Sequence, residues 1–340
     1  MADADSAHWT PDILGDEFEQ LTLTLADDDQ GPVVATLVRA LPAQAGWWDR
    51  VRGRMPQLHD VDVLYIHGWS DYFFQKRLAR FWTMRGARFF ALDLRKYGRS
   101  LRDGQTPGYI TDLATYDEDI GAALAAMGRG SEGAASSRRL VLFGHSTGGL
   151  VLSLWASRHP DTVDAVILNS PWLEFQVASV RPLIATVAEL QARWAPREVA
   201  PQVDLGFYTR AQQEVADPDD PVEVNPLWRP AQSMAVHAGW FHAILTGHAA
   251  VAAGLAIDAP VCVMLSSRSA RPTRWSDDLT RADSVLVVDD IARAALKLGP
   301  SVTVERIEGA LHDIFLSRRE AREEAYGRLD RWVSGWSSAR

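Results

Sequence analysis

The sequence contains a single cysteine and no excess of basic residues. With one cysteine among 340 residues, an intramolecular disulfide framework is excluded. This residue, Cys262, lies in the apolar run 261–265, which is typical of a buried strand and predicts a packed thiol. The net charge is −9, whereas a protein that binds duplex nucleic acid normally presents a basic face. We therefore expect no nucleic-acid partner.

The sequence also shows neither the residue pattern of a secretory signal nor that of a membrane span. The first six residues are acidic where a secretory signal would be basic, and no apolar segment follows them. The longest stretch without Asp, Glu, Lys or Arg, 231–257, contains three histidines and three glycines. It predicts a buried amphipathic helix leading into a strand rather than an integral membrane span. These features predict a soluble, cytoplasmic protein and leave its oligomeric state open.

Strands alternating with helices dominate the rest of the sequence, in which we find neither internal repeats nor low-complexity tracts. Segments 18–25 and 33–39 alternate apolar and polar residues, which predicts an N-terminal hairpin. Short apolar runs then alternate with segments of helical period, which predicts a parallel sheet with helices on both faces. The predicted class is thus α/β, with a mostly parallel eight-stranded sheet. Its six further strands are 61–66, 88–92, 139–143, 165–168, 261–265 and 302–306.

One long segment interrupts this alternation. Between 171 and 258 the sequence offers helical stretches and repeated prolines but no convincing strand. An insertion of this size predicts a helical lid over the sheet edge where open α/β sheets bind ligands. The chain is then divided into core 1–170, lid 171–258 and core 259–340. The lid tryptophans are either the lid's own core or the lining of an apolar substrate site with few fixed charges, and they are Trp172, Trp194, Trp228 and Trp240.

The strongest functional signal is the pentapeptide Gly144-His-Ser-Thr-Gly148. It has the form G-x-S-x-G between a predicted strand and a predicted helix, where a strained turn exposes a nucleophilic serine. Ser146 is therefore the predicted nucleophile. An oxyanion formed on attack needs hydrogen-bond donors, and the expected donors are the backbone N–H groups of Thr147 and Trp69, the latter in the turn after strand 61–66.

A serine nucleophile needs a base, and in this setting the chain order is serine, acid, histidine. His312 follows the last predicted strand, where a loop would carry it above the sheet. The other histidines fit this order or position less well. Three of them, at 237, 242 and 248, have spacings that do not place a metal pair on one helical face, so no metal site is predicted.

The acid is less sharply defined than the base. Asp283 precedes His312 by enough residues for one helix and one strand, and it is the preferred candidate. Asp289 and Asp278 remain alternatives. Asp313 is interpreted as a local stabiliser, because adjacent side chains on a turn usually diverge.

Taken together, these stretches resemble the α/β-hydrolase superfamily, within it the branch of monoacylglycerol lipases, lysophospholipases and serine aminopeptidase-like hydrolases. The resemblance covers about 62–171 and 259–336 and rests on four motifs: Tyr65-Ile-His-Gly68, segment 92–100, Gly144-His-Ser-Thr-Gly-Gly149 and Gly309-Ala-Leu-His312. It implies an α/β-hydrolase fold that works without a metal or an organic cofactor. One departure concerns the acid: the family places it soon after strand 261–265, whereas here no acid occurs before Asp277.

The predicted function is cleavage of a small apolar carboxylic ester, such as an acyl glycerol, a lysophospholipid or a lactone, through an acyl-enzyme on Ser146. A peptidase or amidase of the serine aminopeptidase type is the main alternative, in which Glu174 or Glu189 would bind the substrate amine. A serine at this turn argues against dehalogenases and epoxide hydrolases, which need an aspartate nucleophile. A non-catalytic ligand-binding homologue is disfavoured because all three candidate residues are present.

Overall fold

The strands of the chain form one mixed sheet. The computed structural model describes residues 8–42, 56–130, 137–175, 181–200 and 204–339. Within these residues nine strands are arranged in the order β1-β2-β3-β5-β4-β6-β7-β8-β9. They are β1 (Thr10–Pro11), β2 (Phe18–Thr24), β3 (Val34–Ala40), β4 (Val61–Ile66), β5 (Arg88–Asp93), β6 (Arg139–His145), β7 (Ala165–Asn169), β8 (Val261–Ser266) and β9 (Val302–Ile307).

The predicted strands are all present, and the sheet has one strand more than expected. The extra strand, β1, has only two residues, too few to produce a periodic pattern in the sequence. β2 and β3 form the predicted antiparallel hairpin, with Leu21 opposite Leu37. β3 joins β5 antiparallel, and every pair from β5 to β9 is parallel. The carboxyl ends of β4, β6, β7, β8 and β9 therefore meet at one edge.

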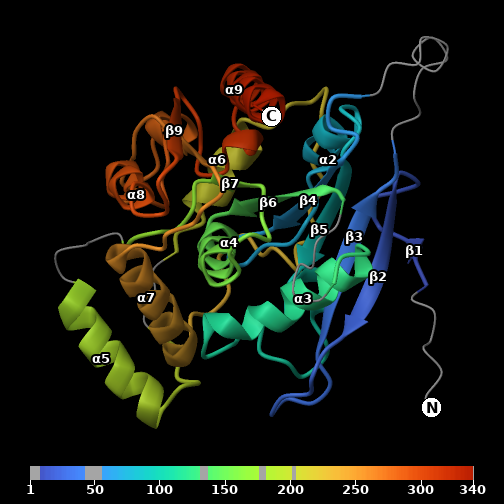
Figure 1. The fold of residues 1–340 in the computed structure, drawn as a ribbon. Coiled ribbons are helices and arrows are strands. Elements are labelled where there is room, and N and C mark those ends of the chain that lie inside the picture. Colours follow the sequence, from blue (N-terminus) through green and yellow to red (C-terminus); the bar gives the residue numbers. More distant parts are fainter. Residues whose placement is uncertain (1–7, 43–55, 131–136, 176–180, 201–203, 340) are drawn as a thin grey trace, which may run out of the picture.

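Helices cover both faces of the sheet (Figure 1). On one face lie α3 (Tyr116–Ala126), α4 (Thr147–Arg158) and α8 (Val288–Ala295), which share an apolar core with residues such as Leu142 and Trp155. On the other face lie α2 (Lys76–Thr83) and α9 (Arg319–Ser338), packed through Trp82 and Leu329. This confirms the predicted α/β class. Cys262 is fully buried in β8, and burial raises the pKa of its thiol.

The described parts of the segment between β7 and β8 consist of helices joined by loops. It contains α5 (Arg181–Trp194), α6 (Phe207–Glu214) and α7 (Ala238–Ala253), and its described part holds one isolated bridge, Val199 to His237, but no strand. α7 confirms the buried helix predicted within 231–257. It lies between the core and α5, which is outermost (Figure 1).

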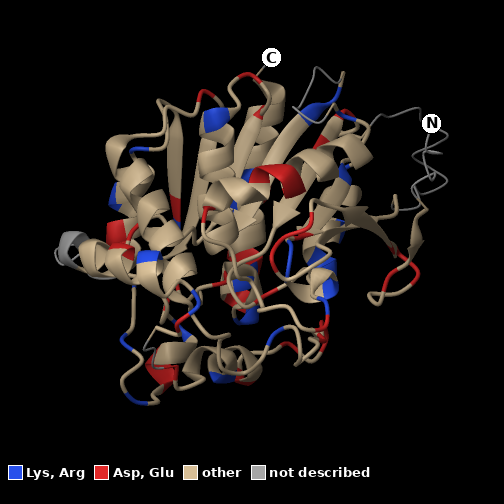
Figure 2. Cartoon of the chain, turned by 90° about the horizontal axis from the view of Figure 1, so that it is seen from below, with Lys and Arg blue, Asp and Glu red and all other residues tan. Residues whose placement is uncertain are grey.

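Charged residues of both signs are interspersed in the view of Figure 2. None of the helices in the described ranges combines the length and the apolar character that crossing a membrane requires. The first six residues, on which the prediction of an intracellular protein partly rests, lie outside the described residues.

Candidate active site

Ser146 occupies a strained turn between β6 and α4. Its backbone φ is 51° and ψ is −117°, a conformation that costs a non-glycine residue on the order of 1–3 kcal/mol. The strain persists because close packing leaves the turn no alternative. A Cβ on Gly148 would lie 2.3 Å from the carbonyl oxygen of His67, and one on Gly68 would lie 3.0 Å from Cβ of Ser146. The glycines of both motifs thus let two turns approach each other around the serine.

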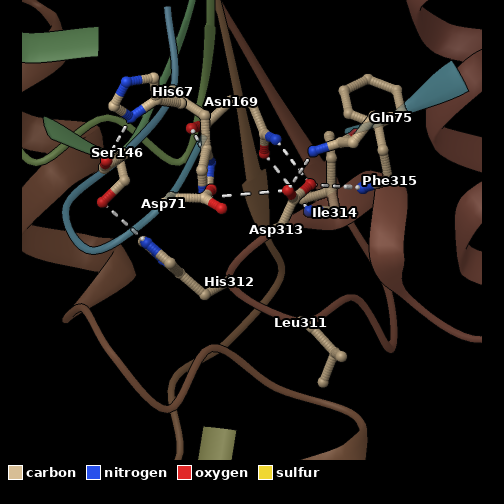
Figure 3. A network of polar contacts seen from close by, with 12 residues as sticks. His67, Asp71, Gln75, Ser146, Asn169, Leu311, His312, Asp313, Ile314 and Phe315 are labelled. Atoms are coloured by element: carbon tan, nitrogen blue, oxygen red, sulfur yellow. Dashed lines mark hydrogen bonds and ion pairs between the residues drawn. The ribbon is translucent and has the colours of Figure 1, made fainter. Parts of the chain in front are cut away.

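Three side chains meet in one hydrogen-bonded line at this turn. The Nε2 atom of His312 lies 3.0 Å from Oγ of Ser146, and its Nδ1 atom lies 2.9 Å from Oδ2 of Asp283. Figure 3 shows the imidazole of His312 directed at the Ser146 hydroxyl. The tautomer that satisfies both contacts donates from Nδ1 to the carboxylate and accepts the hydroxyl proton at Nε2. All three residues are buried.

The long loop after β8 explains how Asp283 reaches this position. The chain leaves β8, travels outward, and returns so that Asp283 bridges to Ser269, close to the end of the strand. The N–H of Asp283 donates to Arg268, and Ala270 donates back to Asp283. Oδ1 of Asp283 accepts from the N–H groups of Val285 and Leu286, at 2.7 and 2.8 Å. The acid is therefore distant from the strand in sequence but adjacent to it in space.

The two alternative acids point elsewhere. Asp278 forms an ion pair with Arg268, and Asp289 forms one with Arg306 at 2.7 Å. More than half of each carboxylate side chain is exposed, at 52% and 64%. Neither of them contacts His312, so the structure brings only Asp283 of the three candidates to the histidine.

The two predicted backbone donors lie beside Ser146. Thr147 is the first residue of α4, so its N–H has no partner within the helix. Trp69 follows β4 in the turn that contacts Ser146, and within the described ranges its N–H meets no hydrogen-bond acceptor. Its turn is fixed by His67, which lies 2.7 Å from the Gly68 carbonyl through Nδ1 and accepts from Leu94 through Nε2. Burial lowers the pKa of His67, which favours this neutral form.

Ser146 and His312 open into a cavity of about 390 Å³. Part of its wall is apolar and part is polar. The apolar part is formed by Trp69, Trp172, Leu205, Phe207, Pro230, Pro272, Val285 and Leu286, and the polar part includes Ser70, Asp71, Asp204, Thr209, Arg229 and Ser233. The wall combines residues of the core with residues of the segment between β7 and β8.

The four tryptophans of that segment have different environments. Trp172 lines the cavity. Trp240 is buried behind it, with its ring centroid 3.8 Å from that of Trp69. Of the four, only Trp172 is among the lining residues, so the interpretation as cavity lining is wrong for the other three. The burial of Trp240 fits the alternative interpretation, a core residue of the lid. Trp228 packs against Tyr72, and Trp194 is 76% exposed at the end of α5, because α7 occupies the space between α5 and the core.

The expectation of few fixed charges in the site is also wrong. Asp71 and Arg229 both line the cavity, and the carboxylate oxygen Oδ1 lies 2.9 Å from Nε of the guanidinium. Burial raises the pKa of Asp71 to about 6, although the nearby Arg229 opposes this shift. The pair was missed because its members are far apart in sequence and neither belongs to a recognisable motif.

The loop that contains Asp71 is attached to the inserted segment at three consecutive residues. Oγ of Ser70 accepts from the N–H of Met234 at 3.1 Å, Asp71 pairs with Arg229, and Oη of Tyr72 accepts from the N–H of Asn225 at 2.7 Å. This loop directly follows Trp69. The segment 225–234 therefore supports the turn that carries one of the candidate oxyanion donors.

Tyr208, on α6, is a further neighbour of His312 that sequence reasoning missed. Its Oη accepts from the N–H of Asp313 at 3.0 Å and from Gln212 at 2.8 Å. The rings of Tyr208 and His312 meet edge to face with centroids 5.7 Å apart. No local pattern distinguishes this tyrosine, because only tertiary packing brings α6 to the histidine loop.

A candidate metal centre does not emerge from the geometry: the described part of the chain contains no group of three or more His, Cys, Asp or Glu placed to hold an ion. The histidines at 237, 242 and 248 are divided between the start and the body of α7. His248 is buried, and its Nε2 lies 2.9 Å from the carbonyl oxygen of Trp172.

Comparison with known proteins finds a curated relative that matches part of the chain. A monoacylglycerol lipase of Mycolicibacterium smegmatis is 26% identical over 155 residues, which are 45% of this chain and 52% of that protein. The match thus spans about half the length of that curated relative.

Two solved structures have the same fold at low sequence identity. One is a monoacylglycerol lipase of Paleococcus ferrophilus, with 18% identity, a TM-score of 0.58, and coverage of 81% of this chain and 94% of that chain. The other is a soluble variant of the Saccharomyces cerevisiae monoglyceride lipase bound to a substrate analog, with 16% identity, a TM-score of 0.61, and coverage of 93% and 96%. At such identity the similarity shows the fold alone, which is that of the α/β-hydrolases.

The family itself is shown by a family model described as "Serine aminopeptidase, S33", which matches residues 59–270, more than half of the chain. The matched range includes the Ser146 turn and ends before Asp283 and His312. The chain belongs to the serine aminopeptidase S33 family of α/β-hydrolases.

Proposed function

We propose that the protein is a carboxylic ester hydrolase that forms an acyl-enzyme on Ser146. The observation that carries the proposal is the line from Ser146 through His312 to Asp283, with contacts of 3.0 and 2.9 Å. A serine on a strained turn, hydrogen-bonded to a histidine that a buried carboxylate orients, is the arrangement that nucleophilic acyl transfer requires.

Each step of the reaction assigns a role to a residue of this line. Oγ of Ser146 attacks the ester carbonyl carbon while its proton moves to Nε2 of His312. The oxyanion that forms accepts from the N–H groups of Trp69 and Thr147. The tetrahedral intermediate then expels the alcohol, which takes the proton from His312. Water, deprotonated by His312, attacks the acyl-enzyme and releases the acid and Ser146.

The cavity favours a substrate with an apolar acyl part and a polar remainder. The wall formed by Trp69, Trp172 and Leu286 suits an acyl chain, and the Asp71–Arg229 pair suits hydroxyl or carbonyl oxygens. A monoacylglycerol or a related ester of a small polar alcohol combines both properties. The monoacylglycerol lipases among the similar proteins are consistent with this class.

Ester cleavage is favoured over aminopeptidase activity by the state of the carboxylates at the cavity. A free substrate amine needs an unpaired carboxylate, but Asp71 is paired with Arg229. Asp204 accepts from the N–H groups of Gly206 and Ser233 and from the Ser233 hydroxyl. Glu174 and Glu189, the carboxylates that this alternative would use, do not line the cavity.

Residues 171–258 act as a lid in this proposal. Their described parts supply Trp172, Tyr208 and Arg229 to the cavity wall, so they determine which substrates fit. The catalytic line itself comes from the two core parts, 1–170 and 259–340.

Labelling with a fluorophosphonate tests the nucleophile. Mass spectrometry should find one rapidly formed adduct, on Ser146. Ser146→Ala should lose labelling and reduce turnover by on the order of 10⁴-fold or more. Ser153→Ala is the matched control. It alters a buried serine of α4 whose hydroxyl donates to the Gly149 carbonyl, and it should keep both the labelling of Ser146 and the turnover. Rapid labelling of a serine other than Ser146 would refute the proposed nucleophile.

Substrate class is tested with two series on the same preparation. kcat/KM for nitrophenyl esters should rise from acetate to a medium acyl chain, since each buried methylene contributes about 0.8 kcal/mol. Amino-acid anilides should be cleaved far more slowly. Faster anilide cleavage would support the peptidase alternative, and absence of turnover on every substrate would support a ligand-binding role.

A further inference from the structure

A second buried carboxylate lies directly after the candidate base. Asp313 is 1% exposed, and its carboxylate lies among side chains and backbone groups that include Gln75 and Asn169 (Figure 3). Its Oδ2 accepts from Nε2 of Gln75 at 2.7 Å, and its Oδ1 accepts from Nδ2 of Asn169 at 2.8 Å and from the N–H of Phe315 at 3.1 Å. The adjacent side chains therefore diverge, as expected. His312 contacts Ser146 and Asp283, whereas the Asp313 carboxylate accepts from other groups.

The network joins the ends of several core elements. Asn169 ends β7, and its Oδ1 also accepts from the N–H of Ile314 at 3.3 Å. Gln75 precedes α2, and the backbone N–H of Asp313 donates to Tyr208 on α6. The loop that carries His312 is thus held by side chains from β7, from the residue before α2, and from α6.

The negative charge of Asp313 needs a separate explanation. Its backbone contact with Phe315 caps a short helical turn, which an asparagine would do equally well. Burying a carboxylate costs several kcal/mol unless partners compensate it, and the hydrogen-bond partners here are neutral donors. Among the described residues the one basic side chain within 4.0 Å of this carboxylate is His145, whose Nε2 lies 3.9 Å from Oδ2. The ring of His145 lies 5.1 Å from that of His312.

We propose that Asp313 is a positioning residue that fixes the loop of His312 and supplies a second negative charge favouring protonation of this histidine during the reaction. The inference rests on the proposed function. Asp283 orients the imidazole by direct contact, whereas Asp313 acts through the backbone and through space. A negative charge near a base favours its protonated form, and Asp313 directly follows His312 in the chain.

The other charged and titratable groups around the network do not supply a net negative charge beside His312. Asp71 is paired with Arg229, so the two largely cancel. Tyr65, Tyr208 and Tyr326 are uncharged at neutral pH, as phenols ordinarily are, and burial raises the pKa of each further. His145 is neutral as well, because burial lowers its pKa. Asp313 thus remains, with Asp283, the net negative charge beside His312.

The experiment compares Asp313→Asn, which removes the charge, with Asp313→Glu, which keeps it. The wild type must first label at Ser146 and turn over an ester, which tests the proposed function separately. Asp313→Asn should then reduce kcat about 10-fold and move the acid limb of the kcat/KM profile about one unit to lower pH. Asp313→Glu should reduce kcat through its altered geometry but leave the acid limb in place.

Asp112→Asn is the matched control, because Asp112 caps another short helical turn by accepting from Ala114 and lies on the surface. Asp112→Asn should change neither kcat nor the pH of the acid limb. A folded Asp313→Asn protein whose acid limb stays at the wild-type pH would overturn the proposal. Should this variant fail to fold, Asn169→Ala tests the positioning role: kcat should fall severalfold, and an unchanged kcat would overturn the proposal.

Discussion

Replacing Asp283 by asparagine is the sharpest single test of the candidate site. Oδ1 of Asp283 accepts from two backbone N–H groups and Oδ2 accepts from His312. The asparagine oxygen will keep the two backbone contacts, which turns its NH₂ group toward Nδ1 of His312. The histidine then presents a lone pair at Nδ1 and carries its proton on Nε2, where it can no longer accept the Ser146 proton. This wrong tautomer should lower kcat by on the order of 10²–10⁴-fold, about 3–5 kcal/mol in the barrier.

The assay is steady-state hydrolysis of a nitrophenyl ester, accompanied by thermal unfolding of each variant. Stability should change little, because both backbone contacts remain. Asp278→Asn and Asp289→Asn are matched controls, since each alters an exposed carboxylate that pairs with an arginine instead of His312. They should retain nearly full activity. The reasoning is refuted if Asp283→Asn is as active as these controls, or if Asp289→Asn is the disabling change.

Three further predictions concern the cavity wall. Tyr208→Phe removes the hydroxyl that accepts from the Asp313 N–H and leaves that donor unpaired. The free energy of unfolding should therefore fall by about 1–3 kcal/mol, which urea unfolding measures. kcat should fall as well, which ester turnover measures. Because burial raises the pKa of Asp71 to about 6, the folded state takes up a proton there between about pH 4 and 6. The unfolding free energy of the wild type relative to Asp71→Asn should therefore decrease as pH rises through this window, and a constant difference would contradict the shift. Trp172→Ala should flatten the acyl-chain dependence of kcat/KM, whereas Trp194→Ala, which alters an exposed side chain, should leave it unchanged.

Local patterns in the sequence determined the scaffold. The apolar runs predicted every strand of more than two residues, because buried parallel strands must be apolar on both faces. The glycine-flanked serine between strand and helix located the turn of Ser146, because only small neighbours permit such a close approach. The position of His312 followed from its place after the last strand. These features depend on residues close together in the chain, so the sequence alone was sufficient to predict them.

Tertiary structure decided what depends on distant contacts. Asp283 was one of three possible acids until the return of the long loop to Ser269 brought it, and neither Asp278 nor Asp289, to the histidine. Composition predicted an apolar cavity, but packing of the inserted segment placed Arg229 opposite Asp71 and left Trp194 exposed. No periodicity encodes such pairings, because loop paths and contacts between segments are set by the packing of the whole chain.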